Sequence, residues 1–202
     1  MRLFFQALDR GIFFSINYLT VDFYWFKILA YFCARFLVLV FVLVLLWLLI
    51  AKPKDQSQEF DGKKFHLNTN QKAVILALIT LALAFLIDVL IGVVFPRPRP
   101  FITYPEATKH LDLWVDVSSF PSTHALSVFA IAVSLWWSGF KKLGPILFLL
   151  AIFVGLGRVA GGVHYPSDVV AGALIGIFCA WLVHREKGII KKMFKLNRVE
   201  LS

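Results

Sequence analysis

The chain has 202 residues, of which 59% are hydrophobic and only 16% are charged, and its mean hydropathy is +0.78. Soluble domains are about 45–50% apolar and about 25% charged, so this composition excludes an ordinary soluble protein and indicates a membrane protein. The net charge of +9 does not indicate nucleic-acid binding, because the basic residues lie between apolar segments, where membrane proteins carry them to fix their orientation.

The N-terminal stretch, 1–22, is expected to lie at the membrane interface. Residues 3–19 alternate aromatic and polar side chains around Asp9 and Arg10, a pattern typical of an amphipathic helix in the membrane plane. A weakly apolar additional span is the alternative. Residues 23–72 then provide the first clear span and a cytoplasmic loop.

Five longer apolar segments predict transmembrane helices, since about 20 apolar residues cross the hydrocarbon region. Their bounds are 23–51, 73–95, 120–140, 143–160 and 166–183. At this length the chain can form one domain. We therefore expect an all-α, polytopic membrane helix bundle of five to six spans, with a functional core over residues 73–184.

The basic residues are divided unequally between the two ends of this bundle. One end receives the loop within 51–72, the turn after the third segment and the C-terminal tail, 185–202. Its basic residues are Lys52, Lys54, Lys63, Lys64, Lys72, Lys141, Lys142, Arg185, Lys187, Lys191, Lys192, Lys195 and Arg198. By the positive-inside rule this end and the tail are cytoplasmic, and the other end faces outward.

Three polar clusters interrupt the apolar sequence, and all of them fall at the outward end. They are 96–101 with two Arg-Pro pairs, 120–124 with the sequence Phe-Pro-Ser-Thr-His, and 157–168 with an arginine, a histidine and an aspartate. Ionisable residues are costly in a membrane and usually mark function. Because clusters far apart in sequence meet at one end, we predict an active site there.

The residue types in these clusters suit phosphoryl chemistry. Arginines can hold phosphoryl oxygens in bidentate fashion and balance the charge of a transition state, and the candidates are Arg97, Arg99 and Arg158. The stretch that contains Ser122 and Thr123 opens a helix, where free backbone N–H groups favour an anion.

Two histidines and an aspartate complete the predicted site. Pro166 suits the first turn of the last helix, which places His164 just before that helix and Asp168 within its first turn. The carboxylate of Asp168 can accept a hydrogen bond from the imidazole of His164 and leave its other nitrogen free to attack. His124 could then protonate the leaving oxygen.

Each element also has a simpler interpretation. Arg-Pro pairs often mark the end of a span, and Ser122 can be an N-cap. A metal site formed by His124, His164, Asp168 and Asp116 is a further alternative. However, the neighbouring arginines would repel a cation and attract a phosphate, so we expect neither a metal nor another cofactor.

At these residues the sequence resembles the membrane type 2 phosphatidic acid phosphatase and vanadium haloperoxidase superfamily. The matching motifs are Arg99-Pro100, then Pro121-Ser122-Thr123-His124, then Arg158, His164 and Asp168 at the family's spacing. The resemblance covers residues 73–184 and implies that they form a phosphatase core that works without metal. It implies a phosphohistidine on His164, oriented by Asp168, with His124 as general acid.

The same resemblance implies that Arg99, Arg158 and Ser122 hold the phosphate. The chain departs from the signature at three positions, where Gly92 replaces a lysine, Thr123 replaces a glycine and Gly157 replaces a serine. The backbone N–H of Thr123 would still be available to the phosphate. Arg97 would partly supply the contact of the missing lysine.

The missing lysine and the surrounding residues narrow the resemblance to the bacterial undecaprenyl-diphosphatase branch linked to bacitracin resistance. The similar stretches are 91–101, 120–124, 162–166 and, near the N-terminus, 13–17. The branch implies hydrolysis of undecaprenyl diphosphate, a polyprenyl diphosphate, to undecaprenyl phosphate and phosphate. It also implies a multi-pass protein of the bacterial inner membrane that recycles the carrier lipid of cell-wall synthesis.

Several other functions remain open. Within the family they are a phosphatidylglycerophosphate, phosphatidic acid or lipid A phosphatase, or a phosphotransferase. The alternatives that are not enzymes are a transporter and an inactive helical scaffold. A transporter would more often carry its polar residues at mid-membrane, and a scaffold would not need two histidines and an aspartate at these positions. The sequence predicts a membrane lipid and the bilayer as partners, and it does not predict an oligomeric state.

Overall fold

The computed structural model describes residues 2–52, 68–104, 106–107 and 118–186. These residues form eight α-helices and no strand, which confirms the predicted all-α class. The helices are α1 (Arg2–Asp22), α2 (Tyr24–Arg35), α3 (Leu37–Ile50), α4 (Thr69–Val94), α5 (Pro100–Thr103), α6 (Thr123–Trp137), α7 (Leu143–Ala160) and α8 (Pro166–Arg185). Most of the basic tail predicted at 185–202, from residue 187 onward, and most of the loop before α4 lie outside the described residues.

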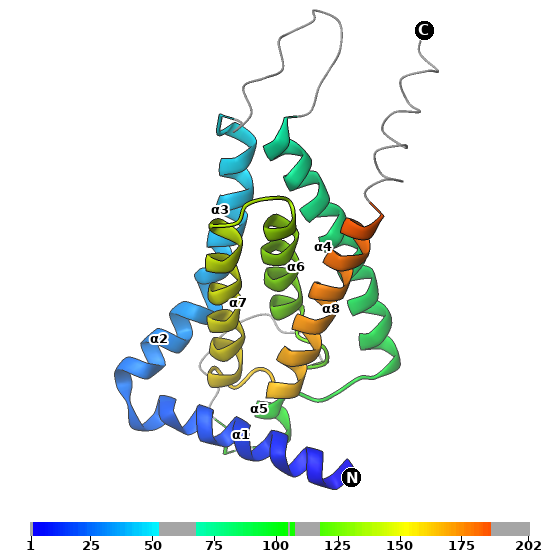
Figure 1. The fold of residues 1–202 in the computed structure, drawn as a ribbon. Coiled ribbons are helices and arrows are strands. Elements are labelled where there is room, and N and C mark those ends of the chain that lie inside the picture. Colours follow the sequence, from blue (N-terminus) through cyan, green and yellow to red (C-terminus); the bar gives the residue numbers. More distant parts are fainter. Residues whose placement is uncertain (1, 53–67, 105, 108–117, 187–202) are drawn as a thin grey trace, which may run out of the picture.

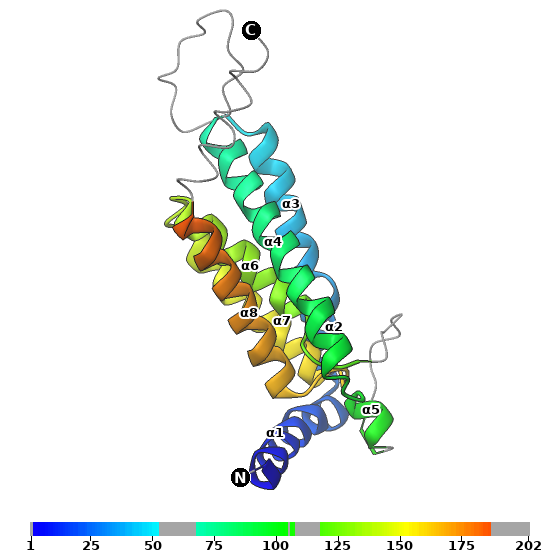
Figure 2. The same ribbon diagram turned by 90° about the vertical axis from the view of Figure 1, so that its right-hand side faces the viewer.

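Helix α6 lies in the middle of the bundle. It packs against α3, α4, α7 and α8, and Figures 1 and 2 show these helices side by side along the length of the bundle. Most of its side chains are buried, as expected for a helix that is apolar on all sides. The end of α6 that carries the predicted site residues is therefore surrounded by the ends of its neighbours.

The outer surface of the bundle is apolar. Among the described residues, four segments are long and apolar enough to cross a membrane, and α6 is an apolar helix of only 15 residues. The four segments are Tyr24–Ile50, Thr69–Val94, Leu143–Ala160 and Pro166–Arg185. Large apolar side chains on them, such as Leu43, Val89 and Leu174, are exposed. An exposed apolar surface of this extent is typical of contact with lipid.

The first predicted span, 23–51, is divided at Phe36 into α2 and α3, and α2 runs obliquely to α3 in Figure 1. The two parts follow different partners, because α2 packs mainly on α7 whereas α3 also contacts α4 and α6. The contact of α2 with α7 is close at Gly157. A Cβ atom there would lie 2.7 Å from the backbone N of Ala34 and 2.9 Å from the carbonyl O of Ala30.

Helix α1 lies across one end of the bundle (Figures 1 and 2) and contacts α2, α7 and α8. It is not among the segments that are long and apolar enough to cross a membrane. Asp9, Phe13 and Asn17 are buried on its inner side, whereas Phe4 and Leu8 are exposed. Its crosswise position agrees with an interfacial helix, and a location at the membrane interface stays a prediction.

Helices α6 and α8 approach each other at two glycines. A Cβ atom on Gly172 would lie 2.5 Å from the carbonyl O of Ser122, and one on Gly176 would lie 2.4 Å from the carbonyl O of Leu126. Small residues at this spacing allow membrane helices to pack backbone to backbone. The first turns of α6 and α8, which carry predicted site residues, are held together in this way.

We expect Gly176→Val to lower the thermal unfolding midpoint in detergent micelles, because α6 and α8 must separate to admit the side chain. Overpacking of this kind costs about 1–3 kcal/mol or more. Gly11→Ala is the control, since nothing lies within 4 Å of a Cβ atom at Gly11 and alanine favours a helix. An unchanged midpoint for Gly176→Val would contradict the close packing.

Candidate active site

The three polar clusters predicted from the sequence meet at one end of the bundle. They lie between α4 and α5, at the start of α6, and from the end of α7 to the first turn of α8. The turn between α7 and α8 contains Gly162 with φ of 78°, a conformation that other residues rarely adopt. The backbone N–H of Ser122 donates to the carbonyl of Asp168 at 3.0 Å, which ties the start of α6 to α8.

His164 lies at the end of this turn and is buried. Its Nδ1 is 2.9 Å from the backbone carbonyl O of Ser119. A carbonyl only accepts hydrogen bonds, so Nδ1 carries the proton and Nε2 keeps its lone pair. The nearest oxygen of Asp168 is 3.8 Å from Nδ1, which is longer than a hydrogen bond. The hydrogen-bond partner of the His164 ring is therefore the carbonyl of Ser119, whereas the sequence predicted the carboxylate of Asp168.

The carboxylate of Asp168 is completely buried and is surrounded by donors. Oδ2 accepts a hydrogen bond from the backbone N–H of Tyr165 at 2.8 Å and another from the hydroxyl of Ser119. Oδ1 accepts a hydrogen bond from Nη1 of Arg97 at 2.7 Å. A buried charge is stable only with such partners. Ser119 thus binds both residues, Asp168 through its hydroxyl and His164 through its carbonyl.

Arg99 and Arg158 lie close to His164. Nη1 of Arg99 is 3.2 Å from Nε2 of His164 and donates to the carbonyl of Val163 at 2.9 Å. Arg158 is 1% exposed, yet its Nε and Nη1 have no hydrogen-bond partner among the described residues, and neither does the buried hydroxyl of Ser122. Buried donors are normally paired, so these groups are suited to an oxyanion.

His124 and Thr123 begin α6 beside these residues. His124 is close enough to Arg158, His164 and Arg99 to interact with them electrostatically. The hydroxyl of Thr123 donates to Oδ2 of Asp88 on α4 at 2.8 Å. The side chain of Thr123 is therefore directed toward α4.

Arg97 is held by α1 and α8. Its guanidinium donates to Oγ of Ser167, Oδ1 of Asp168 and Oδ2 of Asp9, each at 2.7 Å, and it lies 3.7 Å from the centre of the Tyr165 ring. Burial lowers the pKa of Arg97, but the carboxylates of Asp168 and Asp9 outweigh this effect and raise it. These contacts do not support the prediction that Arg97 replaces the missing lysine as a phosphate contact.

The sequence patterns do not single out three residues of the site, which are Asp9, Ser119 and Ser167. Ser119 binds His164 and Asp168, while Ser167 donates to Asp9 from its backbone N–H at 2.9 Å and from its hydroxyl at 2.6 Å. The available signal for Asp9 is an acidic residue within an apolar, aromatic-rich helix, where a charge needs a partner. Nothing distinguishes the two serines from ordinary residues of a turn or helix start.

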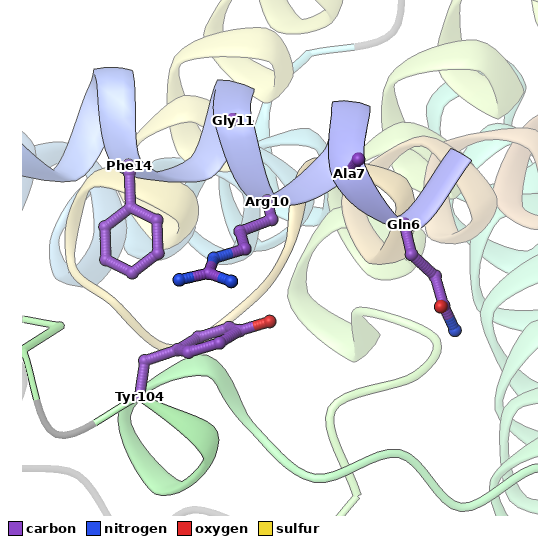
Figure 3. Close-up of a pocket in the computed structure, with 6 residues that line it drawn as sticks. All are labelled: Gln6, Ala7, Arg10, Gly11, Phe14 and Tyr104. Carbon is purple, nitrogen blue, oxygen red and sulfur yellow. The ribbon is translucent and has the colours of Figure 1, made fainter. Parts of the chain in front are cut away.

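An open groove of about 400 Å³ lies between α1 and the segment after α5 (Figure 3). It is lined by Gln6, Ala7, Arg10, Gly11, Phe14 and Tyr104. The guanidinium of Arg10 lies 4.6 Å from the centre of the Tyr104 ring and 3.7 Å from a carboxylate oxygen of Glu106. The groove does not include His164 or the arginines close to it.

The alternative of a metal site would need several ligand side chains close together in the part of the chain that the structure describes. There, no group of three or more His, Cys, Asp or Glu side chains is placed to hold a metal ion. Asp116, the fourth residue of that alternative, lies outside the described residues.

Taken together, these features define an all-helical membrane protein with a buried histidine and two arginines at one end of its bundle. Residues 72–188 match the PAP2 superfamily, and the chain belongs to that family. The family predicted from the motifs is thereby confirmed.

Three similar proteins illustrate the relationship. The chain is 30% identical to the putative undecaprenyl-diphosphatase YbjG of Escherichia coli strain K12, over 85% of this chain and 79% of that protein. It is 37% identical to the bacitracin transport permease protein BcrC of Bacillus licheniformis, over 56% of this chain and 55% of that protein. The chain thus spans about half the length of this relative. The crystal structure of Aquifex aeolicus LpxE superposes with a TM-score of 0.64 at 25% identity, over 88% of this chain and 95% of LpxE.

We expect the imidazole of His164 to stay neutral throughout the neutral pH range. Burial lowers the pKa of His164 to about 4, with Arg158 and Arg99 adding to this effect and Asp168 opposing it. The ring therefore gains its second proton only as the pH falls through about 4, whereas an exposed imidazole does so near 6.5. ¹⁵N NMR of histidine-labelled protein measures this, with the resonance assigned by its loss in His164→Ala. Titration of that resonance near pH 6.5 would be the contrary result.

Proposed function

We propose that the protein is an integral-membrane lipid phosphatase that hydrolyses undecaprenyl diphosphate to undecaprenyl phosphate and phosphate. The observation that carries this proposal is the set of buried donors on Arg158 and Ser122 that have no hydrogen-bond partner among the described residues. They lie at the same end of the bundle as His164, whose Nε2 is unprotonated and lies 3.2 Å from Nη1 of Arg99. A phosphoryl group would supply the acceptors that these donors lack.

In the proposed reaction, Nε2 of His164 attacks the terminal phosphorus, and the bond from phosphorus to the bridging oxygen breaks. His124 donates a proton to that oxygen as undecaprenyl phosphate leaves. The anionic substrate favours the protonated form of His124. Neutral His124 then accepts a proton from water, which attacks the phosphohistidine and releases phosphate and neutral His164.

The phosphoryl oxygens are held by Arg99 and Arg158, by the hydroxyl of Ser122 and by the backbone N–H of Thr123. Arg158 and Ser122 are buried before the substrate binds, so they stabilise the transition state with little reorganisation. Nη1 of Arg99, which lies 3.2 Å from Nε2 of His164, turns from that nitrogen to a phosphoryl oxygen as the attack begins. The choice of polyprenyl diphosphate is supported by the name of the similar protein from E. coli and by the residues at the motif positions. Phosphatidic acid, phosphatidylglycerophosphate and lipid A are the competing substrates.

The test is phosphate release by the purified protein from each of these lipids, with a chelator present. We expect release to be fastest from undecaprenyl diphosphate, to survive the chelator and to fall by at least about 10³-fold in His164→Ala, as for other nucleophiles. His184→Ala is the matched control, because His184 lies near the opposite end of α8. There its Nδ1 donates to the carbonyl of Ala180 and its Nε2 lies 3.2 Å from Oγ of Ser138.

Each contrary result has a definite meaning. Release that survives His164→Ala would overturn the phosphohistidine mechanism, and a strict requirement for a divalent ion would favour a metal site. Faster release from another lipid would change the substrate and keep the mechanism. Transfer of phosphate to a second lipid instead of water would make the protein a phosphotransferase.

We also propose that the site faces outward and the opposite end of the bundle faces the cytoplasm. Supporting this, the structure describes five of the basic residues predicted to be cytoplasmic, and they lie toward the end opposite His164: Lys52, Lys72, Lys141, Lys142 and Arg185. The positive-inside rule assigns such an end to the cytoplasm.

Orientation is measurable with a thiol reagent that does not cross membranes. Glu106 and Lys142 are both exposed and flank opposite ends of the bundle, while the native Cys33 and Cys179 are buried. We expect Glu106→Cys to be labelled in intact cells, or in spheroplasts of a bacterium with an outer membrane. Lys142→Cys should be labelled only after permeabilisation. The reverse pattern would show an inward-facing site.

A further inference from the structure

Helix α1 is attached to both ends of the turn that carries His164. Nδ2 of Asn17 donates to the carbonyl of Ala160, the last residue of α7, at 2.9 Å. The carboxylate of Asp9 accepts a hydrogen bond from the backbone N–H of Ser167, in the first turn of α8, at 2.9 Å. Both backbone groups lie at helix ends, where they lack partners within the helix.

The part of α1 between these two contacts also packs on the turn. Phe13 is completely buried, and its ring centre lies 5.7 Å from that of Tyr165. Asp9, Phe13 and Asn17 are spaced four residues apart, so they share one face of α1. That face therefore follows the turn from the end of α7 to the start of α8.

Asp9 is connected to the predicted nucleophile by a continuous chain of hydrogen bonds. Its Oδ2 binds Nη2 of Arg97, and Nη1 of the same guanidinium binds Oδ1 of Asp168. Asp168 binds the hydroxyl of Ser119, whose carbonyl holds Nδ1 of His164. The Asp9 side chain is only 10% exposed, and hydrogen bonds between charged groups in such a place are strong.

We propose that Asp9 is a positioning residue for the nucleophile. By holding both Arg97 and the first turn of α8, it fixes Asp168 and, through Ser119, the orientation of His164. Asp9 lies outside residues 72–188, which match the family, so in this chain the site includes a residue contributed by α1. This inference rests on the proposed phosphohistidine chemistry.

The test compares Asp9→Asn with Asp22→Asn. An asparagine can replace only one of the two acceptor oxygens of Asp9, so either Ser167 or Arg97 loses its partner. Asp22 is the matched control, an exposed carboxylate at the end of the same helix. For folded protein recovered by size exclusion, we expect Asp9→Asn to lower kcat about 10- to 100-fold, the range typical of groups that orient a functional histidine. KM should stay within about twofold, because the phosphate donors are untouched.

A double variant separates positioning from a general loss of stability. If Asp9 acts through Arg97, then Asp9→Asn combined with Arg97→Gln should lower kcat little further than Arg97→Gln alone. If Asp9→Asn does not fold, Ser167→Ala decides the question, since it removes a hydroxyl shared by Asp9 and Arg97 and leaves both charges in place. A fall in kcat at constant KM supports the proposal there as well.

The inference would be overturned by a wild-type kcat in folded Asp9→Asn, or in Ser167→Ala if Asp9→Asn does not fold. It would also be overturned if the losses of kcat in the double variant were fully additive. These results differ from failure of the proposed function, in which the wild type releases no phosphate or His164→Ala stays active. In that case ¹⁵N NMR tests the positioning alone. Asp9→Asn should then populate the Nε2–H tautomer of His164, whereas Asp22→Asn should leave the tautomer unchanged. An unchanged tautomer in Asp9→Asn would overturn the positioning role of Asp9.

Discussion

The buried carboxylate of Asp168 is the group on which the arrangement of the site depends. An ion removed from water must be surrounded by donors, and here they come from three parts of the chain, through Arg97, Ser119 and the backbone of Tyr165. Each donor belongs to a segment that the site needs. Satisfying one charge therefore brings together the segment after α4, the segment before α6 and the turn between α7 and α8.

The same requirement explains why Arg97 and α1 belong to this end of the bundle. Arg97 binds Asp168 through one guanidinium nitrogen and Asp9 through another, so α1 supplies the second of the two carboxylates that hold this side chain. The arginines nearer His164 are in a different situation. Arg158 is buried, and two of its donors have no partner among the described residues, an arrangement that is unfavourable in the free protein and that a bound anion would relieve.

Helix packing determines how rigidly these groups are held. Glycines on α8 bring its backbone against α6, and Gly157 on α7 brings it against α2. Helices satisfy their own backbone hydrogen bonds within a membrane, so they can be packed this closely without other polar partners. The polar groups of the site are then confined to the helix ends, where backbone donors are free and side chains can meet.

The sequence alone determined the helical class, the apolar segments, the family and the gathering of three polar clusters at one end. These features follow from the length of the apolar segments and from the local spacing of polar residues, such as the four residues that separate His164 from Asp168. The tertiary structure decided the bend at Phe36, the carbonyl of Ser119 as the partner of His164, and the pairing of Arg97 with Asp9. These contacts join residues 45 or more positions apart, and no local pattern encodes which of several possible polar partners a folded chain brings within hydrogen-bond distance.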